Sequence, residues 1–177
     1  MTVRVMPGRA RGVVRAPASK SVAHRYLIAA ALASGESRLT GLTLSDDLLA
    51  TCDGLRALGC GIRFEGTTAV VSGGADLRPR GDLPCRECGT TLRLLLPLCL
   101  ISGEAATLTG SEKLLSRPLG VYENLARERG FRFERGPCRV TVAGRLTPGT
   151  YRVPGDISSQ FVSGLCYALS CLDGEST

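Results

Sequence analysis

Three long apolar segments punctuate the chain and predict helices that are buried on nearly every side. They cover residues 21–33, 90–101 and 158–171. A Ser-Gly-Glu or Asp-Gly-Glu triplet follows each segment and supplies a glycine where helices commonly end. Two further helices are predicted to be amphipathic. One begins near Ser45 and the other near Pro118, with apolar residues at helical spacing.

Short strands are predicted around these helices, and together they form a repeat. One strand precedes a buried helix, at residues 12–16 and 150–153. One strand follows the helix, at residues 38–41 and 106–109. Two strands close the unit, at residues 61–65 and 69–72 in the first copy and 131–135 and 139–142 in the second. Residues 33–41 match residues 101–110 at a displacement of 68 to 69. A third copy begins at Asp173, so the sequence holds two βαβαββ units and the opening of a third.

The fold class expected from this repeat is α/β (α+β), with the buried helices at the centre and the sheets around them. The predicted divisions are an N-terminal segment 1–16, unit one at 17–83, unit two at 84–148 and a truncated third unit at 149–177. A unit of this size cannot bury its apolar faces alone. We therefore expect the units to pack around a pseudo-threefold axis.

Composition narrows the function. The 177 residues are 44% hydrophobic and 21% charged, as in globular proteins. The longest apolar run, residues 94–101, is far shorter than the roughly 20 residues of a membrane helix. The N-terminus lacks the apolar core of a secretion signal. We expect a soluble, cytoplasmic protein with no membrane partner.

The net charge of +6 suits anionic partners, and the basic residues are arginines apart from Lys20 and Lys113. Aromatic residues make up only 5% of the chain, which leaves little to stack on nucleic-acid bases. Cys85 and Cys88 form a single CxxC pair, whereas a structural zinc site needs four ligands and the chain has one histidine. No metal is expected.

The first residues of the three buried helices carry the candidate chemistry. If the units are equivalent, these N-termini meet, and they bring hydroxyl, amide and ammonium groups together: Ser19, Lys20, Ser21, Gly89, Thr90, Thr91, Ser158, Ser159 and Gln160. Arg25 and Arg93 occupy matching positions one turn on, where the third copy has Gly164. Helix capping alone would explain the hydroxyls but not charges inside apolar helices. We therefore expect a phosphate or carboxylate site.

The same residues carry a family resemblance. The segment Pro-Ala-Ser-Lys-Ser-Val-Ala-His-Arg at 17–25 resembles the "PGSKSxxxR" signature of the 3-phosphoshikimate 1-carboxyvinyltransferase (EPSP synthase) family. Further blocks of that family are similar to residues 45–47, 89–93, 117–118 and 155–161, in the same order. The resemblance implies two lobes of three βαβαββ units each, with this chain as most of the N-terminal lobe. Segment 1–16 is then expected to pair with the C-terminal lobe.

The resemblance also implies a reaction: an enolpyruvyl group moves from phosphoenolpyruvate to the 5-hydroxyl of shikimate 3-phosphate, without a cofactor. It implies that shikimate 3-phosphate binds Lys20, Ser21, Arg25, Ser158, Ser159 and Gln160. It implies that phosphoenolpyruvate binds Lys20, Gly89, Arg117 and Gln160, with Thr90 and Arg93 as additional anion contacts. Lys20 is the candidate catalytic residue, and neighbouring arginines are expected to lower its pKa.

Two departures from the family pattern matter. Residues 86–90 read Arg-Glu-Cys-Gly-Thr where the family commonly has Gly-Asn-Ala-Gly-Thr, so Glu87 brings a carboxylate near the expected phosphoenolpyruvate site. The C-terminal lobe, which supplies other acid–base groups, lies outside this sequence, and the chain alone is expected to be inactive. Two alternatives stay open. One is a UDP-N-acetylglucosamine enolpyruvyl transferase, which typically has Lys-Asn where this chain has Lys20-Ser21. The other is a basic nucleic-acid-binding module.

Overall fold

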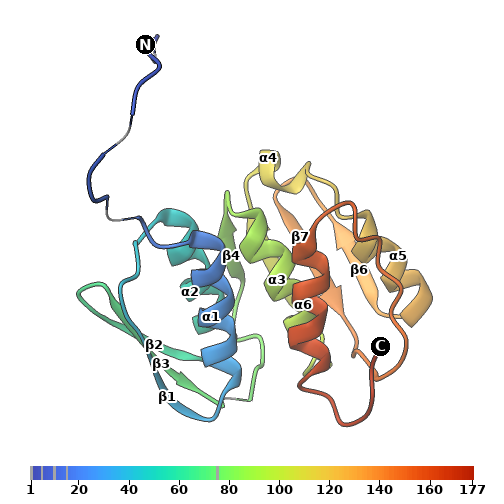
Figure 1. Ribbon diagram of the computed structural model, residues 1–177. Coiled ribbons are helices and arrows are strands. Elements are labelled where there is room, and N and C mark those ends of the chain that lie inside the picture. Colours follow the sequence, from blue (N-terminus) through green and yellow to red (C-terminus); the bar gives the residue numbers. More distant parts are fainter. Residues whose placement is uncertain (1, 5, 10, 15, 75) are drawn as a thin grey trace.

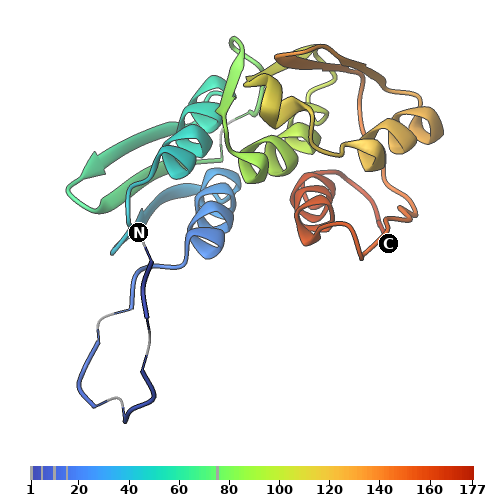
Figure 2. The ribbon, with the colours of Figure 1, turned by 90° about the horizontal axis from the view of Figure 1, so that it is seen from above.

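The computed structural model describes residues 2–4, 6–9, 11–14, 16–74 and 76–177. Its body consists of two β-sheets with helices packed between and around them (Figure 1). The N-terminal segment extends away from this body (Figures 1 and 2). Its described residues form neither helix nor strand, so the predicted strand at 12–16 is wrong for residues 12–14 and 16. Arg15 and residues 1, 5 and 10 lie outside the described residues. A strand needs a hydrogen-bonded neighbour, and the described segment has none.

Unit one contains two helices and three strands. They are α1 (Lys20–Leu32), β1 (Gly35–Leu39), α2 (Asp46–Ala57), β2 (Gly61–Glu65) and β3 (Thr68–Gly73). The sheet is antiparallel with the order β1-β3-β2. Ser19 caps α1 by accepting a hydrogen bond from the Val22 amide, and Ser45 caps α2 through the Leu48 amide. Local capping therefore sets where both helices begin.

Unit two contains the full βαβαββ pattern. Its elements are β4 (Leu83–Arg86), α3 (Gly89–Cys99), β5 (Ala106–Gly110), α4 (Glu112–Leu115), α5 (Gly120–Arg129), β6 (Arg132–Arg135) and β7 (Arg139–Ala143). The strand order is β4-β5-β7-β6, with β4 parallel to β5 and the other pairs antiparallel. The short α4 was not predicted; it begins where the Ser111 hydroxyl accepts from the Leu114 amide. The repeat is otherwise confirmed in this unit.

The third unit contributes α6 (Ser159–Leu169). The strand predicted at 150–153 is wrong: residues 150–153 form no strand, and the neighbouring Gly149 forms one isolated parallel bridge with Ser176. Main-chain hydrogen bonds link the Tyr151 amide to Thr177 and the Thr177 amide to Gly149.

The buried helices α1, α3 and α6 lie together in the middle of the molecule (Figure 2), which confirms the predicted centre of the fold. Helix α3 packs against α6, while α1 packs against α2 and β3. Helix α3 is buried along nearly its whole length, as predicted. Helices α1 and α6 each keep one open face, where Val22, Tyr26 and Val162 are 44%, 60% and 42% exposed. The prediction of burial on every side was wrong for these two helices.

Within the described ranges, no helix combines the length and the apolar character that crossing a membrane requires.

Candidate active site

The N-termini of α1, α3 and α6 converge, and hydrogen bonds join their side chains. Gln160 of α6 donates from Nε2 to Oγ1 of Thr90 on α3 at 2.8 Å. Its Oε1 accepts from Nη1 of Arg93 at 2.9 Å. Arg25 of α1 donates from Nε and Nη2 to Oγ of Ser163 on α6, at 3.3 and 3.2 Å. The structure thus brings together residues that lie up to 138 positions apart in the sequence.

Two arginines lie over the start of α3. A Cβ added to Gly89 would lie 2.9 Å from Nη1 of Arg117 and 3.7 Å from Nη1 of Arg93. Burial lowers the pKa of Arg93, and the charge of Arg117 lowers it further. Neither guanidinium has a carboxylate partner among the described residues, and the buried Nε of Arg93 has no hydrogen-bond partner there. Two cations beside a helix N-terminus favour an anion at this place.

Lys20 lies on the other side of this corner and already has a partner. Its Nζ donates to Oδ2 of Asp47, in the first turn of α2, at 2.5 Å. This hydrogen bond raises the pKa of Lys20, with the carboxylate charge adding to the effect. The predicted lowering of that pKa by neighbouring arginines is therefore wrong: a carboxylate in contact outweighs cations farther away. The same contact lowers the pKa of Asp47.

The remaining predicted residues surround this corner. Ser158 caps α6 by accepting from the Gln160 amide, and Ser159 is exposed in the first turn. Ser21 is exposed, and its main-chain oxygen accepts from Nη1 of Arg25 at 3.0 Å. The main-chain oxygen of Arg25 in turn accepts from the Tyr167 hydroxyl at 3.1 Å. These contacts hold Arg25 between α1 and α6 with its charge unpaired by any carboxylate of the described chain.

Comparisons with known proteins identify the family of the chain. The family profile of EPSP synthase (3-phosphoshikimate 1-carboxyvinyltransferase) matches residues 5–177. The chain belongs to the EPSP synthase family.

Relatives within the EPSP synthase family are longer than this chain. It is 41% identical over 177 residues to the 3-phosphoshikimate 1-carboxyvinyltransferase of Clostridium kluyveri, an alignment that covers 98% of this chain and 42% of that protein. It is 37% identical to the enzyme of Clostridium novyi, over 98% of this chain and 43% of that one. EPSP synthase from Acinetobacter baumannii has a similar structure, with a TM-score of 0.72, 26% identity, and coverage of 86% and 36%. The chain thus spans about 42% of the length of the Clostridium kluyveri relative.

The turn before α3 begins with a residue in an unusual backbone conformation. Arg86 stands where the family commonly has glycine, and its φ of 51° lies in the left-handed region. Its guanidinium contacts Asp53 at 2.6 Å and Asp46 at 3.8 Å. These ion pairs with α2 hold a residue whose backbone conformation favours glycine. Glu87 follows in the turn and is exposed.

Sequence reasoning missed Asp47, whose carboxylate accepts a hydrogen bond from Lys20. The Ser-Asp-Asp block at 45–47 matched the family and was interpreted only as a helix start. That interpretation is correct, because Ser45 caps α2 and both aspartates lie in its first turn. The contact of Asp47 with Lys20 depends on how α1 packs beside α2, and no local sequence pattern shows this packing.

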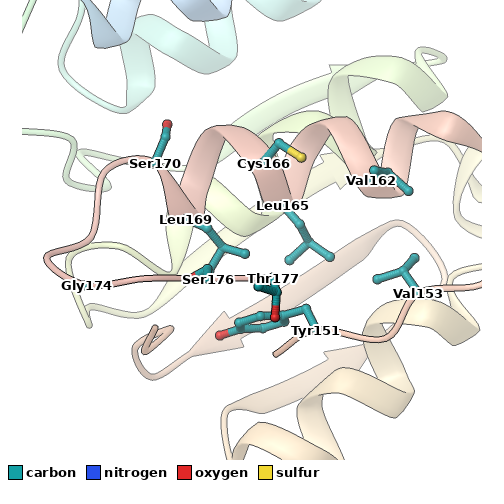
Figure 3. Close-up of a pocket in the computed structure, with 10 residues that line it drawn as sticks. All are labelled: Tyr151, Val153, Val162, Leu165, Cys166, Leu169, Ser170, Gly174, Ser176 and Thr177. Carbon is teal, nitrogen blue, oxygen red and sulfur yellow. The ribbon is translucent and has the colours of Figure 1, made fainter. Parts of the chain in front are cut away.

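A separate apolar groove of about 550 Å³ lies along α6 (Figure 3). Val162, Leu165 and Leu169 of the helix face Tyr151 and Val153 across it. Its lining residues include no lysine or arginine, so it does not match the predicted anion site.

The cysteines and acidic residues show no sign of a metal centre in this EPSP synthase family member. In the part of the chain that the structure describes, no three His, Cys, Asp or Glu side chains gather closely enough to hold a metal ion. Cys85 and Cys88 are free and buried, and burial raises the pKa of the Cys85 thiol far above its ordinary value.

Proposed function

We propose that this chain forms the N-terminal half of the active site of an enolpyruvyl transferase that converts shikimate 3-phosphate and phosphoenolpyruvate. The observation that carries the proposal is the corner where α1, α3 and α6 begin. Arg25, Arg93 and Arg117 lie there beside free helix amides, and no carboxylate of the described chain pairs with them. Both proposed substrates carry phosphate and carboxylate groups, which such a corner favours.

The two groups of contacts suggest two subsites. Arg25, with Ser21 on α1 and Ser158, Ser159 and Gln160 at the start of α6, is assigned to shikimate 3-phosphate. Gly89, Arg117 and Gln160 are assigned to phosphoenolpyruvate, with Thr90 and Arg93 as further contacts. Gln160 belongs to both sets because it follows Ser158 and Ser159 at the start of α6 and its side chain hydrogen-bonds to Thr90 and Arg93. One residue between the subsites would hold the two substrates side by side.

The proposed reaction is an addition followed by an elimination. The 5-hydroxyl gives its proton to a base as its oxygen bonds to C2 of phosphoenolpyruvate, and the methylene carbon takes a proton from an acid, which gives a tetrahedral intermediate. The bond from C2 to the phosphate oxygen then breaks, and the methyl group loses a proton. Because Asp47 raises the pKa of Lys20, this side chain is an ammonium group at neutral pH. Lys20 therefore enters the proposal as the catalytic cation that binds both substrates and stabilises the negative charge of the intermediate.

The rest of the active site is proposed to come from a second, C-terminal lobe, since the chain spans 42% of the Clostridium kluyveri relative. The N-terminal segment 1–16 would pair with that lobe, and the units at 17–83, 84–148 and 149–177 would form the first. The nucleic-acid alternative has no support beyond net charge.

Calorimetric titration of shikimate 3-phosphate into the chain tests this assignment. Lys20→Ala and Arg25→Ala should each weaken binding by about tenfold or more, because each removes a charge-assisted contact worth about 1.5–3 kcal/mol. Lys113→Ala, a change at the only other lysine, should leave binding unchanged. Adding a separately produced C-terminal lobe should then allow phosphoenolpyruvate to bind. Equal binding by all three variants, or stronger binding to DNA than to the sugar phosphate, would contradict the proposal.

A further inference from the structure

Three buried polar side chains, one each from α1, α2 and α3, form a chain of hydrogen bonds beside the cationic corner. His24 is 1% exposed, and Thr51 and Thr91 are fully buried. Nδ1 of His24 lies 2.7 Å from Oγ1 of Thr51, which lies 2.7 Å from Oγ1 of Thr91. Thr91 donates from Oγ1 to the main-chain oxygen of Asp47 at 3.4 Å.

Counting protons fixes the direction of this chain. A carbonyl oxygen only accepts, so the single hydroxyl proton of Thr91 goes to Asp47. The proton between the two threonines must then belong to Thr51, and the proton between Thr51 and the imidazole must belong to His24. Neutral His24 is therefore protonated at Nδ1. Its Nε2 is left as a buried acceptor without a partner in the described part of the molecule.

The chain of hydrogen bonds that begins at His24 on α1 leads back to α1 through Asp47 and Lys20. The carboxylate of Asp47 accepts from Nζ of Lys20, and Lys20 lies one helical turn before His24 on α1. Thr91 thus holds the backbone of the aspartate whose side chain holds the lysine. The Lys20 side chain is 57% exposed and has no other hydrogen-bond partner among the described residues. Its position consequently depends on where the first turn of α2 is held.

We propose that Thr51 is a positioning residue: through Thr91 and the backbone of Asp47 it fixes the ammonium group of Lys20 at the corner where α1, α3 and α6 begin. This inference rests on the proposed function, because the position of Lys20 matters for activity only if Lys20 binds the substrates. Without the Thr51 hydroxyl, His24 Nδ1–H has no acceptor and Thr91 has no donor. The buried groups then lose their fixed order, and the first turn of α2 becomes free to shift away from Lys20.

The chain allows a direct reading of Lys20, because it contains only one other lysine. Labelling lysine with ¹³C and ¹⁵N gives two side-chain NMR signals, with Lys113 as an internal control. In the unmodified chain, Lys20 should titrate above the ordinary lysine range because of Asp47. Thr51→Val, which keeps the shape and removes the hydroxyl, should move the Lys20 titration back toward that of Lys113. Asp47→Asn, which removes the carboxylate itself, sets the full size of the shift.

Thr51→Ser is the matched control, since it restores the hydroxyl and removes the methyl group. It should keep the Lys20 titration of the unmodified chain. Affinity for inorganic phosphate should fall roughly fivefold in Thr51→Val, about the effect of losing one hydrogen bond, and should recover in Thr51→Ser. The lysine titration needs no ligand. Failure of the unmodified chain to bind phosphate would therefore count against the proposed function alone.

Three results would overturn the positioning role. The first is a folded Thr51→Val chain whose Lys20 titrates as in the unmodified chain. The second is a Thr51→Ser chain that behaves like Thr51→Val, which would assign the effect to packing of the methyl group. The third is that neither Thr51→Val nor Thr91→Val folds, which would show that the hydroxyls serve the stability of the core and not the lysine.

Thr91→Val interrupts the same chain of hydrogen bonds from α3 and should reproduce the Thr51→Val shift in the Lys20 titration.

Discussion

His24 is the only histidine of the chain, and burial lowers the pKa of its imidazole from 6.5 to about 4. The unfolded chain takes up this proton as the pH falls below about 6.5, whereas the folded chain does so only near pH 4. The contribution of His24 to the free energy of unfolding is therefore fully present above pH 6.5, and it is lost as the pH falls to about 4. The expected loss is about 3 kcal/mol at most.

Denaturant unfolding at several pH values, together with the single histidine NMR signal, checks this prediction. His24→Gln keeps an N–H donor and does not titrate, so its stability should change less over the same pH range. A histidine signal that titrates near pH 6.5 in the folded chain would contradict the buried, neutral state of His24.

Single residues also show where sequence reasoning stopped. Arg25, Arg93 and Gln160 could be placed at one corner because helix starts and matching repeat positions are local patterns. The effect of Asp47 on Lys20 could not be predicted, since a contact across 27 positions depends on how α1 and α2 pack. The left-handed φ of Arg86 was equally hidden, because arginine gives no signal for such a conformation.

At the scale of elements, the contact between α3 and α6 depends on Gly164. A Cβ at this position would lie 2.6 Å from the main-chain oxygen of Arg93 and 3.3 Å from Cα of Leu94. Both neighbours are backbone atoms, which cannot move aside without displacing α3. The close approach of the α3 backbone therefore leaves no room at position 164 for the arginine that the first two units carry at the matching positions.

Gly164→Ala should destabilise the chain by about 1–3 kcal/mol, even though alanine favours a helix by about 1 kcal/mol over glycine. Urea unfolding measures the change. Gly120→Ala, at the first residue of α5, is the matched control: no atom lies within 4 Å of the added Cβ, and stability should hold or rise. Equal effects of the two substitutions would show that α3 and α6 are not in close contact.

Elements with a strong local signal were predicted well. The alternating pattern at 61–65 gave β2 with its observed bounds, and capping residues placed the start of α2 within a residue. Short elements without such a signal were missed, as with the four residues of α4. The strands predicted at 12–16 and 150–153 have suitable sequences, but strands depend on partners that propensity does not supply.

At the scale of the whole molecule, the groove along α6 leaves apolar side chains open to solvent (Figure 3). We expect it to bind 1-anilinonaphthalene-8-sulfonate, a dye whose fluorescence rises on apolar surfaces. Val162→Lys should weaken dye binding roughly threefold, as expected for losing part of one apolar side chain. Leu44→Lys, at a leucine that is 44% exposed and outside the groove, is the control and should have no effect. Equal dye binding by both variants would place the dye elsewhere.

The arrangement of the repeats around central helices was predictable, because two apolar helices at matching positions must share their buried faces. Which side of α1 and α6 stays open was not predictable. The open faces depend on what else packs against these helices, and Val22, Tyr26 and Val162 look like core residues in the sequence.

The two sheets have different numbers of strands: β5 has β4 beside it, whereas β1 ends its own three-stranded sheet. Among the residues that the structure describes, no main-chain hydrogen bond uses the outer side of Gly35–Leu39, so an extended peptide could pair with this edge. By analogy with β4, a guest backbone would run in the same direction as β1. Glu36 and Arg38 of β1 form ion pairs with Arg63 and Glu65 of β2, so β1 carries charges of both signs. Uncontrolled pairing between copies of the chain is discouraged by those charges.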